Sequence, residues 1–349
     1  MAQQTVRRRR RYATGDADLD ARVEELVQAA GLAGDSDLAA EMVTSILRMA
    51  RKKANRGELK LVNAALKEFA YAFGVFAPYR KTRKVSIFGS SRVTPEDPSY
   101  DCAREFASRI ADEGWMVITG AGPGVMEAGH KGAGAARSFG LNIRLPFESQ
   151  ANPIIESDPK LINFRYFFTR KVTFLKESDA FVLLPGGFGT LDEAFELLTL
   201  VQTGKSDLHP VVLLEPTGGT YWAEWWAFVE ERLAQRGLIS LDDMHLLHHT
   251  DDVGTAVREV VGFYRNYQSQ RYVDGRLVLR LRRAPGQTEL ARLSGKFADL
   301  LEKGTFELAP PSPAEVADDD ALDCDRLAFY FNRRSYGRLR EFVDELNRL

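Results

Sequence analysis

Cysteine is scarce in this chain of 349 residues, which holds only Cys102 and Cys324. The two cysteines lie far apart and fit neither a CxxC motif nor a metal-ligand spacing, which argues against a disulfide framework and a zinc site. His245, His248 and His249 occur together, in a segment expected to be a loop, but no carboxylate cluster accompanies them. We therefore expect no metal site. Such cysteine usage is typical of a reducing cytosol, and we expect a cytoplasmic protein.

An excess of one charge and long apolar runs are absent as well. Lys and Arg total 47 and Asp and Glu total 49, so the net charge is −2, whereas a dedicated nucleic-acid binder is usually basic. No apolar run approaches the roughly 18–20 residues that a transmembrane helix needs. The N-terminus also has no secretory apolar region. We therefore expect neither nucleic acid nor a membrane as a partner.

The first 78 residues divide into a polar tail and a helical extension. In residues 1–19, five arginines from Arg7 to Arg11 precede several aspartates. Because like charges in a row repel, we expect a disordered tail, or else a weak contact of the arginines with nucleic acid or a neighbouring subunit. Residues 20–78 show helical periodicity over Leu38–Met49, after N-cap candidates at residues 35–37, and over Glu58–Phe76. We expect this extension to pack on the core or across a dimer interface.

Between residues 79 and 267, short apolar runs alternate with helical patterns at the spacing of βα units. Most runs are continuous, as expected when helices cover both faces of a parallel sheet. The predicted strands are Val85–Phe88, Trp115–Thr119, Leu141–Leu145, Ala180–Leu184 and Val211–Leu214. This pattern predicts a doubly wound, Rossmann-like α/β domain that binds ligands beyond the carboxyl ends of its strands. Small residues follow three strands, in the turns Gly89-Ser90-Ser91, Gly120–Gly124 and Pro185–Thr190.

Residues 268–349 change character and predict a small α+β appendage. Arg276–Leu281 alternates like a half-buried strand and leads into the helical segment Thr288–Leu301. Arg326–Phe331 does the same before Tyr336–Leu346, which indicates a weak repeat, with chance similarity as the alternative. The connecting segment Ala309–Asp323 is rich in Pro and Asp, so we expect a mobile loop there.

The segment Pro185–Glu193 is the most informative part of the chain. It follows a predicted strand and opens a predicted helix, whose free N–H groups and partial positive charge favour a phosphate when glycines precede them. Thr190 is expected at the N-cap, where its hydroxyl suits a phosphate oxygen. A second interpretation stays open, because Thr190-x-x-Glu193 also fits a capping box, in which Glu193 would only start the helix.

Other nucleotide-binding motifs fit poorly. Gly120–Gly124 lies before a predicted helix, Val125–Phe139, but lacks the third glycine of a dinucleotide fingerprint. Gly204-Lys205-Ser206 ends a helix instead of opening one, so it is no Walker loop. The pair Arg170-Lys171 precedes the predicted helix Val172–Ser178, where it could hold a phosphate or a base, or could be a solvated pair.

Residues 80–265 resemble the LOG ("lonely guy") family of cytokinin-activating phosphoribohydrolases. They also resemble the related bacterial nucleoside 5′-monophosphate nucleosidases, formerly labelled lysine decarboxylases. The family signature PGGxGTxxE is complete from Pro185 to Glu193, and Arg170-Lys171 matches the Arg-Lys pair one helix upstream. The Gly-Ser-Ser turn at residues 89–91 and a GxGPGxM turn at residues 120–126 match two further elements.

The resemblance implies an activity and a set of site residues. It implies hydrolysis of the N-glycosidic bond of nucleoside 5′-monophosphates, such as AMP or cytokinin riboside monophosphates, with no cofactor, by a homodimer or higher homo-oligomer. Arg170 and Glu193 would be the catalytic pair. The alternative is a non-catalytic nucleotide- or cofactor-binding module on the same fold. The substrate-binding residues would be Gly89, Ser90, Gly122, Gly124, Glu148, Lys171, Gly186, Gly187, Gly189, Thr190 and Thr199.

Overall fold

The computed structural model describes residues 12–32, 34–144 and 150–349, and it separates two compact units, Met1–Glu68 and Phe69–Leu349. The five arginines of the predicted tail, Arg7 to Arg11, and Glu148 lie outside the described residues. Among the residues that are described, no helix is both long enough and apolar enough to cross a membrane.

The first unit is helical, as predicted. It contains α1 (Ala17–Ala29), α2 (Ser36–Arg51) and the beginning of α3 (Arg56–Phe76). Helix α1 begins inside the segment that we expected to be a disordered tail, so that prediction is wrong for its last three residues. The reason is local, because the side chain of Asp16 accepts a hydrogen bond from the Leu19 N–H and caps the helix.

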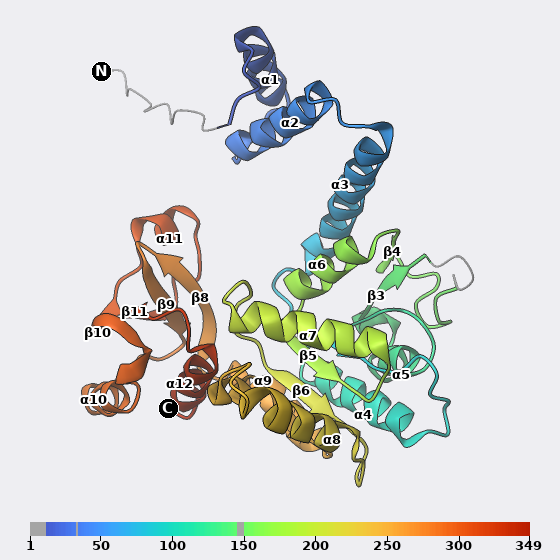
Figure 1. Ribbon diagram of the computed structural model, residues 1–349, viewed down its shortest axis with the longest axis vertical. Coiled ribbons are helices and arrows are strands. Elements are labelled where there is room, and N and C mark those ends of the chain that lie inside the picture. Colours follow the sequence, from blue (N-terminus) through green and yellow to red (C-terminus); the bar gives the residue numbers. More distant parts are fainter. Residues whose placement is uncertain (1–11, 33, 145–149) are drawn as a thin grey trace. The chain divides into compact units, whose positions relative to one another are not determined.

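The second unit is built on a seven-stranded parallel sheet with the order β4-β3-β2-β1-β5-β6-β7. Strands β3 to β6 of this sheet are labelled in Figure 1. The doubly wound α/β fold and all five predicted strands are confirmed. Two short strands were missed, and the interpretation of His248 and His249 as loop residues is wrong, because both belong to the polar edge strand β7. The strands are β1 (Lys84–Phe88), β2 (Met116–Thr119), β3 (Ser138–Ile143), β4 (Leu161–Phe164), β5 (Ala180–Leu183), β6 (Val211–Leu214) and β7 (His248–Thr250).

Helices cover both faces of this sheet. Val117 packs into one apolar cluster, whereas its neighbours Met116 and Ile118 pack into another, as the alternation of a strand requires. The predicted helix Val125–Phe139 is too long, because α5 ends at Ala133 and β3 begins five residues later. The helices of this domain are α4 (Pro98–Asp112), α5 (Val125–Ala133), α6 (Phe167–Glu177), α7 (Phe188–Gln202), α8 (Tyr221–Phe228) and α9 (Val253–Phe263).

The C-terminal appendage is a four-stranded antiparallel sheet with the order β10-β11-β9-β8. The two predicted strands of the appendage are confirmed as β9 and β11, and the structure pairs them directly with each other. The prediction of a mobile loop at Ala309–Asp323 is wrong, because this segment contains α11, where Glu315 is only 1% exposed and pairs with Arg280 and Arg326. The elements are β8 (Tyr267–Val273), β9 (Arg276–Leu281), α10 (Gln287–Lys296), β10 (Leu301–Ala309), α11 (Pro313–Ala317), β11 (Asp325–Phe331) and α12 (Tyr336–Asn347).

Candidate active site

Three small-residue turns meet where the strand order of the sheet reverses. After β1 the chain adds strands to one side, and with β5 it returns to the other side, so the turns that follow these two strands are neighbours at a topological switch point. Ser90 connects them. Its N–H donates to the carbonyl of Pro185 at 3.0 Å, and its carbonyl accepts from the N–H of Val125 at 3.0 Å. The three turns therefore form one continuous edge.

Glycine is required where these turns touch. Gly124 has φ +69°, and a Cβ atom there would overlap the Ser90 carbonyl. A Cβ atom on Gly186 would overlap the Thr190 hydroxyl and lie 3.0 Å from the Ser90 nitrogen. Gly187 and Gly189 are different, because an added Cβ atom would meet no other group within 4 Å. The second pair thus leaves space beside the backbone, which is what an approaching ligand needs.

Helix α7 begins without a side-chain cap. Its N-cap is Gly187 and not Thr190, so Thr190 is the third helical residue. The prediction of Thr190 at the N-cap is therefore wrong, and the capping-box interpretation of Glu193 falls with it, because Glu193 lies in the second turn of the helix. The uncapped N–H groups and the helix dipole remain available to an anion. This arrangement favours the phosphate interpretation of the segment.

Glu193 and Arg170 are both largely buried, and their opposite charges interact. Glu193 is 9% exposed, and burial raises its pKa to about 7, although Lys171 and Arg170 act to lower it. Burial likewise lowers the pKa of Arg170, with Glu193 as the main opposing charge. Among the described residues the Nε of Arg170 has no hydrogen-bond partner. A perturbed carboxylate beside an unsatisfied guanidinium is typical of a functional site.

The Arg170 guanidinium also reaches the turn after β2. Its Nη1 lies 3.8 Å from the position that a Cβ atom on Gly120 would occupy. The Phe167 and Phe174 rings lie below it, at 5.1 and 5.8 Å from ring centre to guanidinium carbon. These contacts hold the cation at the carboxyl edge of the sheet, so it faces the same region as Glu193.

Comparison with known proteins places this arrangement in a family. A family model described as "Possible lysine decarboxylase" matches residues 121–260. The cytokinin riboside 5′-monophosphate phosphoribohydrolase of Mycobacterium tuberculosis is 31% identical over 168 residues, which cover 45% of this chain and 83% of that protein. The cytokinin riboside 5′-monophosphate phosphoribohydrolase LOG3 of Arabidopsis thaliana is also 31% identical over 168 residues, covering 46% of this chain and 73% of that protein. This chain belongs to the LOG family.

A solved structure with a different description is also similar. The molybdenum cofactor binding protein of Rippkaea orientalis is 20% identical to this chain, with a TM-score of 0.36, over 51% of this chain and 94% of that one. A likeness of this size bears on neither the fold nor the function of the LOG-family chain.

Two further predicted residues of the LOG-family site, Lys171 and Thr199, differ in their surroundings. Lys171 binds Asp192 at 2.8 Å and Glu196 at 2.5 Å, which ties α6 to α7 on either side of Glu193. Burial acts against the charge of Lys171, but these carboxylates outweigh it and raise its pKa. Thr199 is exposed, and its hydroxyl donates to the carbonyl of Phe195 within its own helix. The structure therefore does not bring Thr199 to the turns, and it engages Lys171 with two carboxylates of α7.

Sequence reasoning missed a buried pair that supports the LOG-family GxGPGxM turn. The amide nitrogen of Asn152 donates to the carbonyls of Ala121 and Gly122, at 3.1 and 3.0 Å. Its side chain also contacts the ring of His130, which is fully buried and bonds Thr119. Burial lowers the pKa of His130. No sequence motif signals this support, because Asn152 acts on backbone groups about thirty residues away.

A second missed contact reaches the turn Pro185–Thr190. The Tyr221 hydroxyl, at the start of α8, donates to the carbonyl of Gly186 at 2.6 Å. This bond holds the carbonyl of Gly186 on the α8 side of the turn. In the sequence Tyr221 stands in an aromatic run that resembles ordinary core, so it carries no signal of this role.

Among the described residues there is no group of three or more His, Cys, Asp and Glu side chains suited to a metal ion.

Proposed function

We propose that this protein hydrolyses the N-glycosidic bond of nucleoside 5′-monophosphates and releases the free base and ribose 5-phosphate. The observation that carries the proposal is the buried Glu193 beside Arg170, one turn behind an uncapped helix N-terminus preceded by glycines. The names of the two relatives given above support the same chemistry. The phosphate of the nucleotide is negative, and it suits the uncapped N-terminus of α7. The sugar becomes positive as its bond to the base breaks, and it suits the carboxylate of Glu193.

The phosphate binds at the start of α7, where the N–H groups of residues 187–190 and the Thr190 hydroxyl are close together. The ribose then extends toward the second turn of the helix. There Glu193 accepts a proton from a water molecule as the water oxygen bonds to the ribose C1′. The C1′–N bond breaks, its electron pair leaves with the base, and the base takes a proton from solvent. The carboxylate also stabilises the positive charge that develops on the sugar, while Arg170 orients the carboxylate or the phosphate.

A decarboxylase that uses a lysine Schiff base fits these residues poorly. Such a lysine needs a lowered pKa so that its amine is free to attack. Lys171, the lysine beside Glu193, is held by two carboxylates, and its pKa is raised. The description of the matching family model therefore finds no support in the chemistry of this lysine.

Activity should rise with pH through about 7. The mechanism needs an ionised Glu193, and its pKa of about 7 means that the ionised fraction falls about tenfold for each pH unit below that value. The measurement is kcat/KM for AMP from about pH 5 to about pH 9, with the midpoint of the acidic limb expected near 7. A profile with no acidic limb in this range would show that Glu193 does not act as a base.

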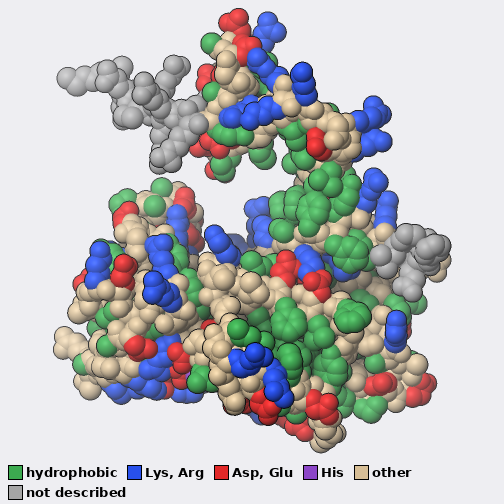
Figure 2. All heavy atoms as spheres, viewed as in Figure 1, with side chains coloured by type: hydrophobic (Ala, Val, Ile, Leu, Met, Phe, Trp, Pro, Cys, Tyr) green, Lys and Arg blue, Asp and Glu red, His purple; other side chains and the backbone are tan. Residues whose placement is uncertain are grey.

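A second copy of this chain is the partner that we propose for the active-site face. Helices α6 and α7 expose large apolar side chains there, and Phe188, the first residue of α7, is 93% exposed. Figure 2 shows apolar side chains gathered over this face. A contiguous exposed apolar patch of this kind marks an interaction surface. Its exposed members are Phe167, Phe168, Val172, Phe188 and Phe195.

Substituting the centre of this patch should give a monomer. Val172→Glu places a charge in the proposed interface, so light scattering after size-exclusion chromatography should report one chain where the unaltered protein reports two. Leu308→Glu is the matched control, because Leu308 is 50% exposed against 44% for Val172 but lies on the appendage strand β10. A monomeric unaltered protein, or a Val172→Glu protein that stays dimeric, would argue against this interface.

The experiment that tests the proposed activity is direct. The purified protein is incubated with a panel of nucleoside 5′-monophosphates, including AMP, GMP, CMP and an N6-prenylated AMP, and the released base is quantified by chromatography. Base release from at least one of them is expected. Binding of these nucleotides without any release would support the alternative of a non-catalytic binding module.

A further inference from the structure

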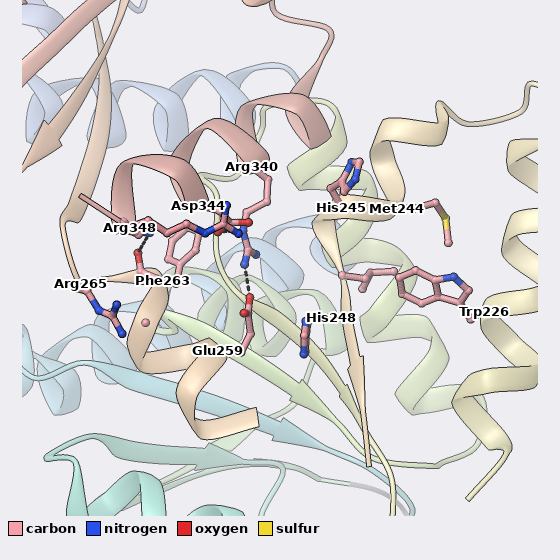
Figure 3. A pocket seen from close by; sticks show the side chains of 13 residues that line it. Trp226, Met244, His245, His248, Glu259, Phe263, Arg265, Arg340, Asp344 and Arg348 are labelled. Carbon is pink, nitrogen blue, oxygen red and sulfur yellow. Dashed lines mark hydrogen bonds and ion pairs between the residues drawn. The ribbon is translucent and has the colours of Figure 1, made fainter. Parts of the chain in front are cut away.

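A cavity of about 560 Å³ lies at the edge of the large sheet that faces away from the active site (Figure 3). His248, the first residue of β7, and Phe263, the last residue of α9, both line it, which places it at the amino ends of the parallel strands. Its other walls come from the 3₁₀ turn Leu241–Leu246 and from α12 of the appendage. None of its lining residues belongs to the three turns of the active site.

The central group of this cavity is Arg340. It is only 3% exposed, and in Figure 3 its guanidinium projects from α12 toward Glu259. One nitrogen binds Glu259, and Nε binds Asp344 at 3.0 Å. The third nitrogen, Nη1, is buried and has no hydrogen-bond partner among the described residues. Buried donors are almost always satisfied, so a guanidinium N–H that stays unpaired in a cavity wall indicates an acceptor supplied by a ligand.

The other lining residues define the chemistry of that ligand. Both carboxylates of the cavity, Glu259 and Asp344, are already engaged by Arg340, whereas Arg265 adds a positive charge with no ion pair among the described residues. The electrostatic potential inside the cavity therefore favours an anion. Trp226 and Phe263 add aromatic surface, and the Phe263 ring already lies against the Arg340 guanidinium, at 4.7 Å from ring centre to guanidinium carbon, whereas Figure 3 shows Trp226 on the opposite side of the cavity. A volume of about 560 Å³ falls within the range of small-molecule sites.

We propose that this cavity binds a small organic anion, a phosphate or carboxylate joined to a flat ring. One anionic oxygen accepts the hydrogen bond of Arg340 Nη1, and the ring lies against Trp226. This site is separate from the proposed nucleosidase centre and does not depend on that function.

The test uses the full chain labelled with ¹⁵N and follows the indole N–H signal of Trp226, assigned with Trp226→Phe. The probes are phenyl phosphate and benzoate, which distinguish the two anions, and inorganic phosphate, which lacks the ring. At least one ring-bearing probe should shift the Trp226 signal in a saturable way. Arg340→Lys should weaken that binding about tenfold or more, because lysine keeps a charge for Glu259 and Asp344 but cannot present a third donor in the same plane.

Matched variants keep the result interpretable. Arg292→Ala removes an exposed arginine of α10 that lies outside the cavity, and it should bind like the unaltered protein. Glu193→Gln should also bind unchanged, which separates this site from the active site. Should Arg340→Lys fail to fold, Trp226→Ala must weaken phenyl phosphate binding, measured by calorimetry. Absence of a saturable shift with every probe, or equal affinity in the Arg340→Lys protein, would overturn the proposal and leave water as the partner of Nη1.

Discussion

Glu193→Gln should give a folded protein that binds AMP but hydrolyses it at least about 100-fold more slowly. The substitution removes one negative charge with almost no change in shape. Since Glu193 makes no capping box, the start of α7 does not depend on it. Loss of a charge aimed at the transition state affects kcat, whereas the phosphate contacts that determine binding remain. Turnover of AMP and its dissociation constant are the two measurements.

The control for this prediction is Asp192→Asn, on the same helix. Asp192 is exposed and pairs with Lys171, so its loss should reduce turnover only by a small factor. Near-normal turnover in the Glu193→Gln protein would show that Glu193 is not catalytic, and it would favour the alternative of a non-catalytic binding module.

Glu193→Gln should also change stability in a pH-dependent way. The folded state raises the pKa of Glu193 from 4.5 to about 7, so the folded state holds this proton more tightly than the unfolded state. Ionisation therefore opposes folding. The cost is absent below about pH 4.5, grows as the pH rises, and reaches roughly 3 kcal/mol above about pH 7. The Gln protein should melt at a higher temperature than the unaltered protein at about pH 8 but not at about pH 4.

Adenosine should be a far poorer substrate than AMP, by about 1,000-fold in kcat/KM. Two charge-assisted hydrogen bonds to the phosphate, each worth about 2 kcal/mol, account for a difference of this size. The donors are the N–H groups at the start of α7 and the hydroxyl of Thr190, which is buried beside Gly186. The measurement is the rate of adenine release from each compound under the same conditions.

Thr190→Val tests the location of that phosphate. Valine has nearly the shape of threonine but no hydroxyl, so turnover of AMP should fall while the slow turnover of adenosine stays the same. Comparable rates for adenosine and AMP in the unaltered protein would show that residues 186–190 do not bind the phosphate.

The sequence by itself determined the domain class and the identity of the site segment. Buried parallel strands such as Val211–Leu214 are continuous apolar runs, and a glycine turn between a strand and a helix is a local pattern, so both are visible without tertiary information. The LOG-family assignment followed from the same kind of evidence. Strand β7 was missed because an edge strand with two histidines has no apolar signal.

Only the tertiary structure decided what individual side chains do. It removed Thr190 from the N-cap, because the helix begins three residues earlier than the local pattern indicated. It tied Lys171 to α7, buried Glu315 in a segment predicted to be mobile, and left one nitrogen of Arg340 unpaired in a cavity. Each of these outcomes depends on groups that are distant in the sequence and meet only after folding. Local patterns encode backbone conformation and burial, whereas partners, desolvation and pKa values arise from contacts between elements.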